Sequence, residues 1–437
     1  MTSTAEDLRD VRPRRQQMSL AVAAAITLPA IVIRVASISL GHPGDAIAFG
    51  AAIVGAAFLL SWAAEAAQLD ISAGLAIAVL AFIAVLPEYA VDVVFAGKAG
   101  TNVAAHGASC LPPGSTDASP CSLALANMTG SNRLLIGIGW SMVVFVAWWQ
   151  WRKRGRRETS VVLERSHSVE LAFLAVATAY SLTLPLRRTI TIVDAVILVG
   201  LFGAYTWRIA RSPADEPHLV GPARYLGCFS KAGRRTAVVS MLVFAAVVIV
   251  LCAERFAEAL VGTGSQLGVS EFLLVQWLAP LASEAPELLV AGMYAYRLNT
   301  NAGLGTLVSA KVNQWTLLVG TLPVVFAITS ASHHGLPIDA AQREELLLTA
   351  AQSAFAVAIL SNLSISAREA LALFSLFWAQ FLLGAVIPSS VHGVERVVVA
   401  IVYLVLAAGI LVRDRRRLPG LMRDGFLASH AELRSQA

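Results

Sequence analysis

Apolar residues in this chain come in runs of about 20, separated by short segments that carry Gly, Pro and charged side chains. As a helix, such a run crosses ~30 Å of hydrocarbon. The runs do not alternate between apolar and polar positions, as the strands of a membrane barrel would. A lipid-exposed backbone must also satisfy its own hydrogen bonds. The pattern therefore predicts an all-α membrane protein with about twelve transmembrane helices.

The predicted spans are 18–40, 46–67, 72–97, 122–150, 169–186, 190–210, 237–261, 269–297, 303–329, 345–362, 369–388 and 394–412.

Composition supports this interpretation. Only 14% of the residues are charged and 57% are hydrophobic, whereas a soluble domain is typically about 25% charged. The net charge of +5 could suggest a nucleic-acid partner. We predict none, because the basic residues are divided among loops between apolar runs. The four cysteines form no Cys-x-x-Cys motif or Cys/His cluster, so we expect no cofactor beyond transported cations.

The basic residues also predict an orientation. With the amino terminus in the cytoplasm, most of the 33 lysines and arginines fall in cytoplasmic segments, as the positive-inside rule requires. Those expected outside, or at the outer edge of a span, are Lys98, Arg187, Arg188, Arg343 and Arg396. We therefore expect a multi-pass protein of the cell membrane with both termini cytoplasmic, in a bacterial inner membrane.

Two loops stand out. Loop 98–121 contains Cys110 and Cys121 among Pro, Gly and Ser. By the predicted orientation it is extracellular, where disulfides persist, so these cysteines are either a bonded pair or two free thiols, and we favour the bond. Loop 211–236 is basic and predicts a cytoplasmic connector that contacts anionic membrane lipids.

An internal repeat is visible in the sequence. Ala64-Glu65-Ala66 and Leu86-Pro87-Glu88 in the first half have counterparts in Ala257-Glu258-Ala259 and Ala285-Pro286-Glu287. Thr129-Gly130-Ser131-Asn132 is echoed by Val308-Ser309-Ala310-Lys311. Each copy holds five predicted spans, an odd number, so the second copy must be inverted relative to the first. Inverted repeats of this kind build secondary transporters, with the ion site at the midplane.

The predicted organisation follows from this repeat. It comprises a terminal segment with an extra helix (1–45), a first repeat (46–210) with the insertion 98–121, the connector 211–236, a second repeat (237–388), and a last helix with a basic tail (389–437).

Glu88 and Glu287 are the leading candidates for an ion site. Each is expected near mid-bilayer, where a carboxylate is costly and therefore functional by default. Each follows a proline, which frees a backbone carbonyl one turn earlier. A carboxylate beside a spare carbonyl oxygen is what a cation site needs. The bland alternative is a structural Glu paired with a Lys or Arg.

Further polar residues surround these two positions. Four acids could relay protons or simply pair with neighbouring cations: Asp92, Glu284, Glu258 and Glu65. Residues on the other motif helices could supply oxygens or contact the site: Ser131, Asn132, Lys311, Asn313 and Gln314. Arg133 is about 200° around the helix from Ser131, so we expect it to point away from the site, toward an acid on another helix.

The paired motifs resemble the two alpha-repeats of the calcium/cation antiporter superfamily, which includes the sodium/calcium exchangers. The resemblance covers about 46–388 and depends mostly on the two Pro-Glu centres and on Gly130-Ser131-Asn132. It implies ten core helices in inverted halves, and exchange of sodium or protons against calcium or another cation by alternating access. It also implies that Glu88 and Glu287 are the central carboxylates and that Ser131 is a ligand.

The sequence departs from the family pattern in ways that bear on the ion. The resemblance implies a hydroxyl residue four positions before each central Glu, which Ser283 keeps and Ala84 lacks. Lys311 replaces the motif asparagine. Because calcium prefers six to eight oxygen ligands, we predict sodium/proton exchange in a divergent sodium:proton exchanger branch. The alternative is sodium/calcium or calcium/proton exchange, with Glu88 and Glu287 holding the transported Na⁺ or Ca²⁺.

Other classes of function fit less well. An intramembrane enzyme is disfavoured because the sequence has no His-Glu-x-x-His and no Gly-x-Gly-Asp motif. A channel is disfavoured because inverted repeats around midplane acids suit alternating access. A non-transporting scaffold or receptor is the remaining class, and it would move no ion in proteoliposomes under any gradient.

Overall fold

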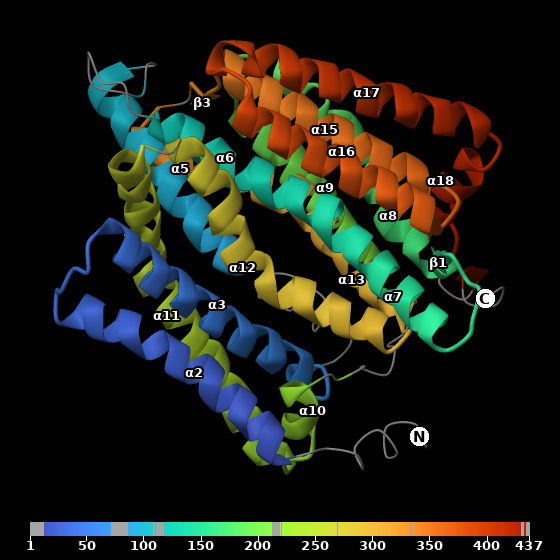
Figure 1. The fold of residues 1–437 in the computed structure, drawn as a ribbon, viewed down its shortest axis with the longest axis horizontal. Helices are drawn as coiled ribbons and strands as arrows, with labels where there is room; N and C mark the ends of the chain where they lie inside the picture. Colours follow the sequence, from blue (N-terminus) through green and yellow to red (C-terminus); the bar gives the residue numbers. More distant parts are fainter. Residues whose placement is uncertain are drawn as a thin grey trace. The chain divides into compact units, whose positions relative to one another are not determined.

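The structure is a computed structural model that describes residues 13–70, 86–107, 110, 118–211, 219, 221–268, 270–332, 334–429 and 432–433. It is built almost entirely of long helices (Figure 1). Among the described residues, eight helices are long and apolar enough to cross a membrane. The chain is therefore a multi-pass membrane protein of the all-α class, as predicted.

The helices of the first half and of the connector follow the predicted spans closely. They are α2 (Pro13–Val35), α3 (His42–Ala67), α5 (Leu86–His106), α6 (Pro120–Leu134), η2 (Leu135–Trp140), α7 (Ser141–Lys153), η3 (Arg165–His167), α8 (Ser168–Ser181), η4 (Leu184–Leu186), α9 (Ile192–Ile209) and α10 (Pro222–Gly227).

The second half repeats the order of helices from α3 to α9, although corresponding helices differ in length. Its helices are α11 (Lys231–Leu267), α12 (Glu271–Tyr296), α13 (Thr300–Asn313), η5 (Gln314–Leu318), α14 (Val319–Ser330), α15 (Ala340–Leu360), α16 (Ala367–Val386), η6 (Ser389–Val391), α17 (His392–Arg413) and α18 (Leu418–Phe426).

Some boundaries differ from the prediction. α5 continues to His106, so Lys98 lies inside a helix and not in the loop where the apolar pattern had ended it. The amino-terminal part of predicted span 72–97 lies outside the described residues. α11 is 37 residues long, which exceeds its apolar run because the helix carries its basic first turns beyond the hydrocarbon. The short helices α10 and α18 were not predicted, because they lie in polar segments.

Local sequence explains where several helices begin. The Ser119 side chain caps α6 by accepting a hydrogen bond from Ser122 N, and Pro120 occupies a first-turn position where its missing N–H costs nothing. α15 and α16 both begin with complete capping boxes, formed by Asp339 with Gln342 and by Ser366 with Glu369.

Two short antiparallel ribbons connect loops that are far apart in the sequence. β1 (Ser160–Val162) pairs with β4 (Ser364–Ser366), with Val161 opposite Ile365. β2 (Thr189–Ile190) pairs with β3 (Leu336–Pro337). β1 and β3 occupy equivalent loops of the two repeats, as do β2 and β4, so the repeat relation converts one ribbon into the other.

These ribbons agree with the predicted topology. β1 and β4 lie in loops expected on the cytoplasmic side, and β2 and β3 lie in loops expected outside. The chain is thus built from two inverted five-helix repeats, with one additional helix before them and one after.

A second sign of the repeat lies in the helices that carry the motifs. Each changes to π-helical geometry, at Leu135–Trp140 in the first copy and at Gln314–Leu318 in the second. The two segments begin at equivalent positions of the repeat. π-helical turns are rare in proteins, and those that occur often lie at functional sites. These segments therefore direct attention to the residues just before them.

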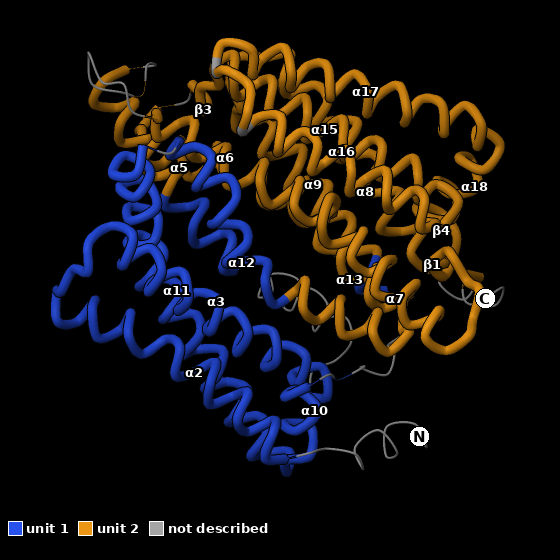
Figure 2. Tube along the Cα trace, viewed as in Figure 1, with its two compact units in different colours: residues 1–94, 209–286 blue, residues 95–208, 287–437 orange. Residues whose placement is uncertain are grey.

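By packing, the chain divides into two compact units, 1–94 with 209–286 and 95–208 with 287–437 (Figure 2). In unit 1, α3 packs closely against α11, and a side chain at Gly50 would collide with the Phe256 ring at 2.8 Å. In unit 2, α8 packs against α13, α15 and α18, and α15 packs against α17. Each unit contains part of both repeats, since α5 and α12 each contribute to both units.

Candidate ion-binding site

The motif residues of the two repeats meet in unit 2. Lys311 on α13 is fully buried, with 0% exposure, and its ammonium contacts α6. Lys311 Nζ donates hydrogen bonds to both the backbone O and the side-chain Oδ1 of Asn132, each at 2.6 Å. Asn132 Nδ2 donates in turn to Met128 O at 2.9 Å, which fixes the amide with its oxygen toward the lysine.

Asn132 and Lys311 are the residues that the sequence repeat places in equivalent positions. They are separated by 179 residues along the chain, yet they are directly bonded. Two equivalent positions can touch only where the repeats themselves meet. The substitution of Lys for the motif Asn therefore puts a permanent donor against the oxygens of its own counterpart.

The lysine is also supported on its aromatic side. Nζ lies 5.3 Å from the centre of the Trp315 ring, within the range of a cation–π interaction. Trp315 Nε1 donates to Ser353 Oγ at 2.9 Å, and that hydroxyl is 2.9 Å from Thr178 Oγ1. The ammonium is thus held from α6, from its own helix and, through Trp315, from α15 and α8.

Two predicted ligands in unit 2 have oxygens without a partner among the described residues. Ser131 Oγ and Asn313 Oδ1 are buried and accept or donate no hydrogen bond there, and their residues are 0% and 4% exposed. Buried polar atoms in proteins are nearly always paired. We call the contact between Asn132 and Lys311 the motif centre. Two orphaned oxygens on the helices that carry it therefore fit the role of ion or water ligands. Gln314 is also buried, at 1% exposure.

The central carboxylates lie on the other two motif helices. Glu88 and Asp92 are one turn apart on α5 and are 4% and 1% exposed. On α12, Glu284 is 3% exposed and Glu287 is half-buried. Ser283 Oγ donates to backbone oxygens of its own helix at 3.2 Å, which leaves its lone pairs available to a cation.

The remaining relay candidates are less enclosed. Glu258 has a side chain that is 43% exposed and lies 3.8 Å from Arg255 on the same helix face. Glu65 is half-buried at the end of α3. Glu258 therefore fits the alternative that the sequence left open, pairing with a neighbouring cation.

Arg133 points away from the motif centre, as expected from its position around the helix. Its Nη1 lies 3.1 Å from Glu345 Oε2 on α15, and its Nη2 donates to Gln380 Oε1 on α16. Sequence reasoning missed Glu345 as the partner. It stood at the first position of predicted span 345–362, where an acid looks like an ordinary helix end.

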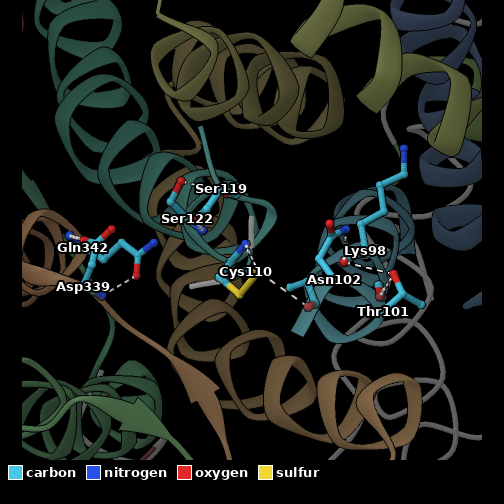
Figure 3. The surroundings of a disulfide bond; sticks show 11 residues. Lys98, Thr101, Asn102, Cys110, Ser119, Ser122, Asp339 and Gln342 are labelled. Atoms are coloured by element: carbon cyan, nitrogen blue, oxygen red, sulfur yellow. Dashed lines mark hydrogen bonds between the residues drawn. A yellow bond between two sulfur atoms is a disulfide. The ribbon is translucent and has the colours of Figure 1, made fainter. Parts of the chain in front are cut away.

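The loop cysteines form a disulfide. Cys110 and Cys121 are bonded across an 11-residue separation with their Cα atoms 6.1 Å apart, in the surroundings drawn in Figure 3. Both residues are buried. The bond ties the segment that follows α5 to the first turn of α6, and α6 is the helix that carries Ser131 and Asn132.

Within the described residues, no group of three or more His, Cys, Asp or Glu side chains could hold a metal ion. Near the motif centre, Ser131 and Asn313 offer side-chain oxygens that have no partner among the described residues.

Comparison with known proteins identifies the family. The chain matches the profile of the family described as "Sodium/calcium exchanger protein" over residues 44–210 and 237–408, ranges that correspond to the two sequence repeats. No curated protein sequence is similar enough to count as a match.

Solved structures show the same relationship. The crystal structure of the H⁺/Ca²⁺ exchanger CAX is 38% identical and covers 97% of this chain and 99% of its own, with a TM-score of 0.85. The structure of native YfkE is 14% identical and covers 89% of this chain and 100% of its own, with a TM-score of 0.58, which shows a shared fold. From the family match and the similarity to CAX, we conclude that this chain belongs to the sodium/calcium exchanger family within the calcium/cation antiporter superfamily.

Proposed function

We propose that the chain is a proton-coupled cation antiporter that works by alternating access, with Glu88 and Glu287 as the carboxylates that bind the exchanged ions. Membership in a family of cation exchangers supports antiport in general. The burial of acids on the motif helices supports proton coupling, because a carboxylate enclosed in low dielectric must bind either a proton or a cation. Competition between the two for the same carboxylates couples their fluxes.

Calcium is the first candidate for the exchanged cation. The observation that carries it is the similarity over nearly the whole chain, at 38% identity, to a solved H⁺/Ca²⁺ exchanger. On this proposal the carboxylates are Glu88 and Glu287, as the sequence repeat predicts, and Ser131 and Asn313 offer oxygens within unit 2.

Sodium is the second candidate, and Lys311 favours it. Its ammonium occupies Asn132 O and Oδ1, so neither oxygen is freely available to an ion. In its ammonium form Lys311 also adds a positive charge beside Asn132, which disfavours a divalent ion more than a monovalent one. The sequence favours sodium/proton exchange on the same ground, because Lys311 replaces the motif asparagine.

The proposal extends to orientation and location. We propose that both termini are cytoplasmic and that the protein resides in a bacterial inner membrane. The two β-ribbons support this topology, since each joins loops that it assigns to one side. Impermeant thiol labelling in intact cells, after reduction, should reach Cys110 and Cys121 from outside.

One experiment tests function and ion together. The purified chain is reconstituted in proteoliposomes with an internal pH-sensitive dye, and Ca²⁺, Na⁺, K⁺ or Li⁺ is added outside. An exchanged cation enters, protons leave, and the internal pH rises. A rise with Ca²⁺ supports the first candidate, and a rise with Na⁺ alone supports the second. If no cation changes the internal pH under any gradient, the proposal of proton-coupled exchange is wrong.

A further inference from the structure

A charged network lies outside the motif centre, among α6, α15, α16 and α17 of unit 2. It begins at Arg133, whose partner Glu345 also receives Arg396 Nε on its other oxygen at 2.8 Å. Arg396 Nη1 then reaches Glu344 Oε2 at 3.4 Å. The helix α17 packs against both α15 and α16 (Figure 1). We call the set of Arg133, Glu345, Arg396, Glu344 and Glu395 the α17 network.

The network becomes more accessible along its length. The side chains of Arg133 and Glu345 are 2% and 4% exposed, and those of Arg396 and Glu344 are 14% and 28% exposed. Ionised side chains inside a membrane protein are expensive and are functional by default. The exposure therefore rises stepwise from the buried arginine on α6 to the first turns of α15 and α17.

Glu395 adds a third carboxyl to two guanidinium groups. Gln380 Oε1 accepts a hydrogen bond from Arg133, and the Gln380 side chain also acts on the Glu395 carboxyl. The charged groups that act on Glu395 are Arg133 on α6, Glu345 on α15 and Arg396 on its own helix. Glu395 Oε1 is buried and has no partner among the described residues. With every carboxyl ionised, the network carries one negative charge in excess.

Two neighbouring polar atoms are also orphaned. Tyr403 OH on α17 and Gln352 Oε1 on α15 have no hydrogen-bond partner among the described residues, and both residues are 1% exposed. Tyr403 is within electrostatic range of Arg133, and Gln352 Nε2 donates to Arg133 O at 3.2 Å. Buried polar atoms without partners need an explanation, and a site that binds and releases a proton provides one.

We propose that the α17 network is a proton-binding site in which Glu395 Oε1 takes the proton. The bound proton cancels the excess negative charge and leaves two carboxylates for two guanidiniums. Loss of the proton changes the charge that acts on Gln380, whose Oε1 accepts a hydrogen bond from Arg133. Arg133 directly follows Asn132, the residue that binds Lys311, so the proton acts on the motif centre from the side of α17.

The first test does not depend on transport. The thermal unfolding of the full chain in detergent is measured between about pH 5 and 8, because stability changes with pH wherever the folded and unfolded states bind different numbers of protons. For the wild type we expect the midpoint to fall by about 3 °C as the pH rises, because the third carboxylate becomes uncompensated. Glu395→Gln keeps the shape and the neutral form, so its midpoint should stay level.

Two further variants make the test decisive. Glu158→Gln removes an exposed loop carboxyl, 49% exposed, and should retain the wild-type pH dependence. Gln380→Met removes the link between Glu395 and Arg133 and should move the pH at which the midpoint falls. A wild-type profile in Glu395→Gln would overturn the proposal. If that variant does not fold, an unchanged profile in Gln380→Met would overturn it.

The effect on transport rests on the proposed function. In proteoliposomes whose internal and external pH are set separately, Glu395→Gln should at least halve the pH sensitivity of exchange on one side of the membrane. A wild-type chain that moves no ion would reject the antiporter, and the unfolding series would still decide the proton site.

Discussion

The bond between Lys311 and Asn132 leads to a specific prediction about stability and selectivity. Lys311→Met removes the ammonium from a fully buried position while keeping a similar volume. It leaves Asn132 O and Oδ1 without the donor that now lies 2.6 Å from each. Lys311→Asn is the matched variant, because it places the residue of the first repeat in the second.

The expected loss can be worked from these contacts. A buried acceptor left unsatisfied costs about 1–3 kcal/mol, and two are exposed to that loss here. Removal of a buried charge recovers some desolvation energy. We therefore expect Lys311→Met to destabilise the protein by roughly 2–4 kcal/mol, which lowers the midpoint of thermal unfolding by about 4–8 °C at ~2 °C per kcal/mol. Lys311→Asn should lose a similar amount, because its shorter side chain does not reach the position of Nζ beside the two oxygens.

The functional assay is the ratio of Ca²⁺-driven to Na⁺-driven proton flux in proteoliposomes. Removal of the lysine's positive charge lowers the cost of binding a divalent ion more than that of a monovalent ion. Both variants should therefore raise the ratio. An unchanged ratio together with an unchanged pH profile would refute the idea that Lys311 acts on the ion.

Three further predictions concern other contacts. The disulfide closes an 11-residue separation, which corresponds to roughly 3 kcal/mol of chain entropy; a reducing agent should lower the unfolding midpoint of the wild type but not of Cys110→Ser/Cys121→Ser. Arg133→Met should cost about 2 kcal/mol, less than a fully stranded charge, because the buried Glu345 carboxylate loses one of its two guanidinium partners and keeps Arg396; adding Glu345→Gln should restore part of that loss in a double-mutant cycle. The hydrogen bond from Arg234 lowers the pKa of Asp70. The stability that this ion pair supplies is therefore present above about pH 4 and is lost as the pH falls through the pKa of Asp70 in the folded protein. Asp70→Asn should flatten the acid end of the unfolding profile, and an acid limb as steep as in the wild type would contradict this.

The arrangement of helices could be predicted because the membrane makes apolar length decisive. Where a run of about 20 apolar residues stands between polar breakers, the structure has a helix. Its ends were less predictable, since hydropathy marks the part of a helix in hydrocarbon and not the helix itself. Lys98 and the basic first turns of α11 lie in helices for this reason. The ribbons β1–β4 and β2–β3 depend on pairing between distant loops, which no local pattern encodes.

The candidate site was predictable where the repeat doubled the signal. The match between Asn132 and Lys311 came from the sequence alone, and the contact between them gives that match a physical meaning. The partner of Arg133 could not be found in this way, because Glu345 lies 212 residues away at a helix end and has no counterpart motif. The π-helical turns after both motif centres also left no pattern in composition or spacing.

The most direct test of the central claim is proton-coupled cation flux in proteoliposomes containing wild type, Glu88→Gln, Glu287→Gln and Glu158→Gln, with thermal unfolding of each variant as a check on folding. An amide keeps the shape of the carboxyl but cannot bind and release a proton. The account predicts that Glu88→Gln and Glu287→Gln fold but move neither Ca²⁺ nor Na⁺ against protons, while Glu158→Gln matches the wild type. Wild-type flux in both motif variants would contradict it.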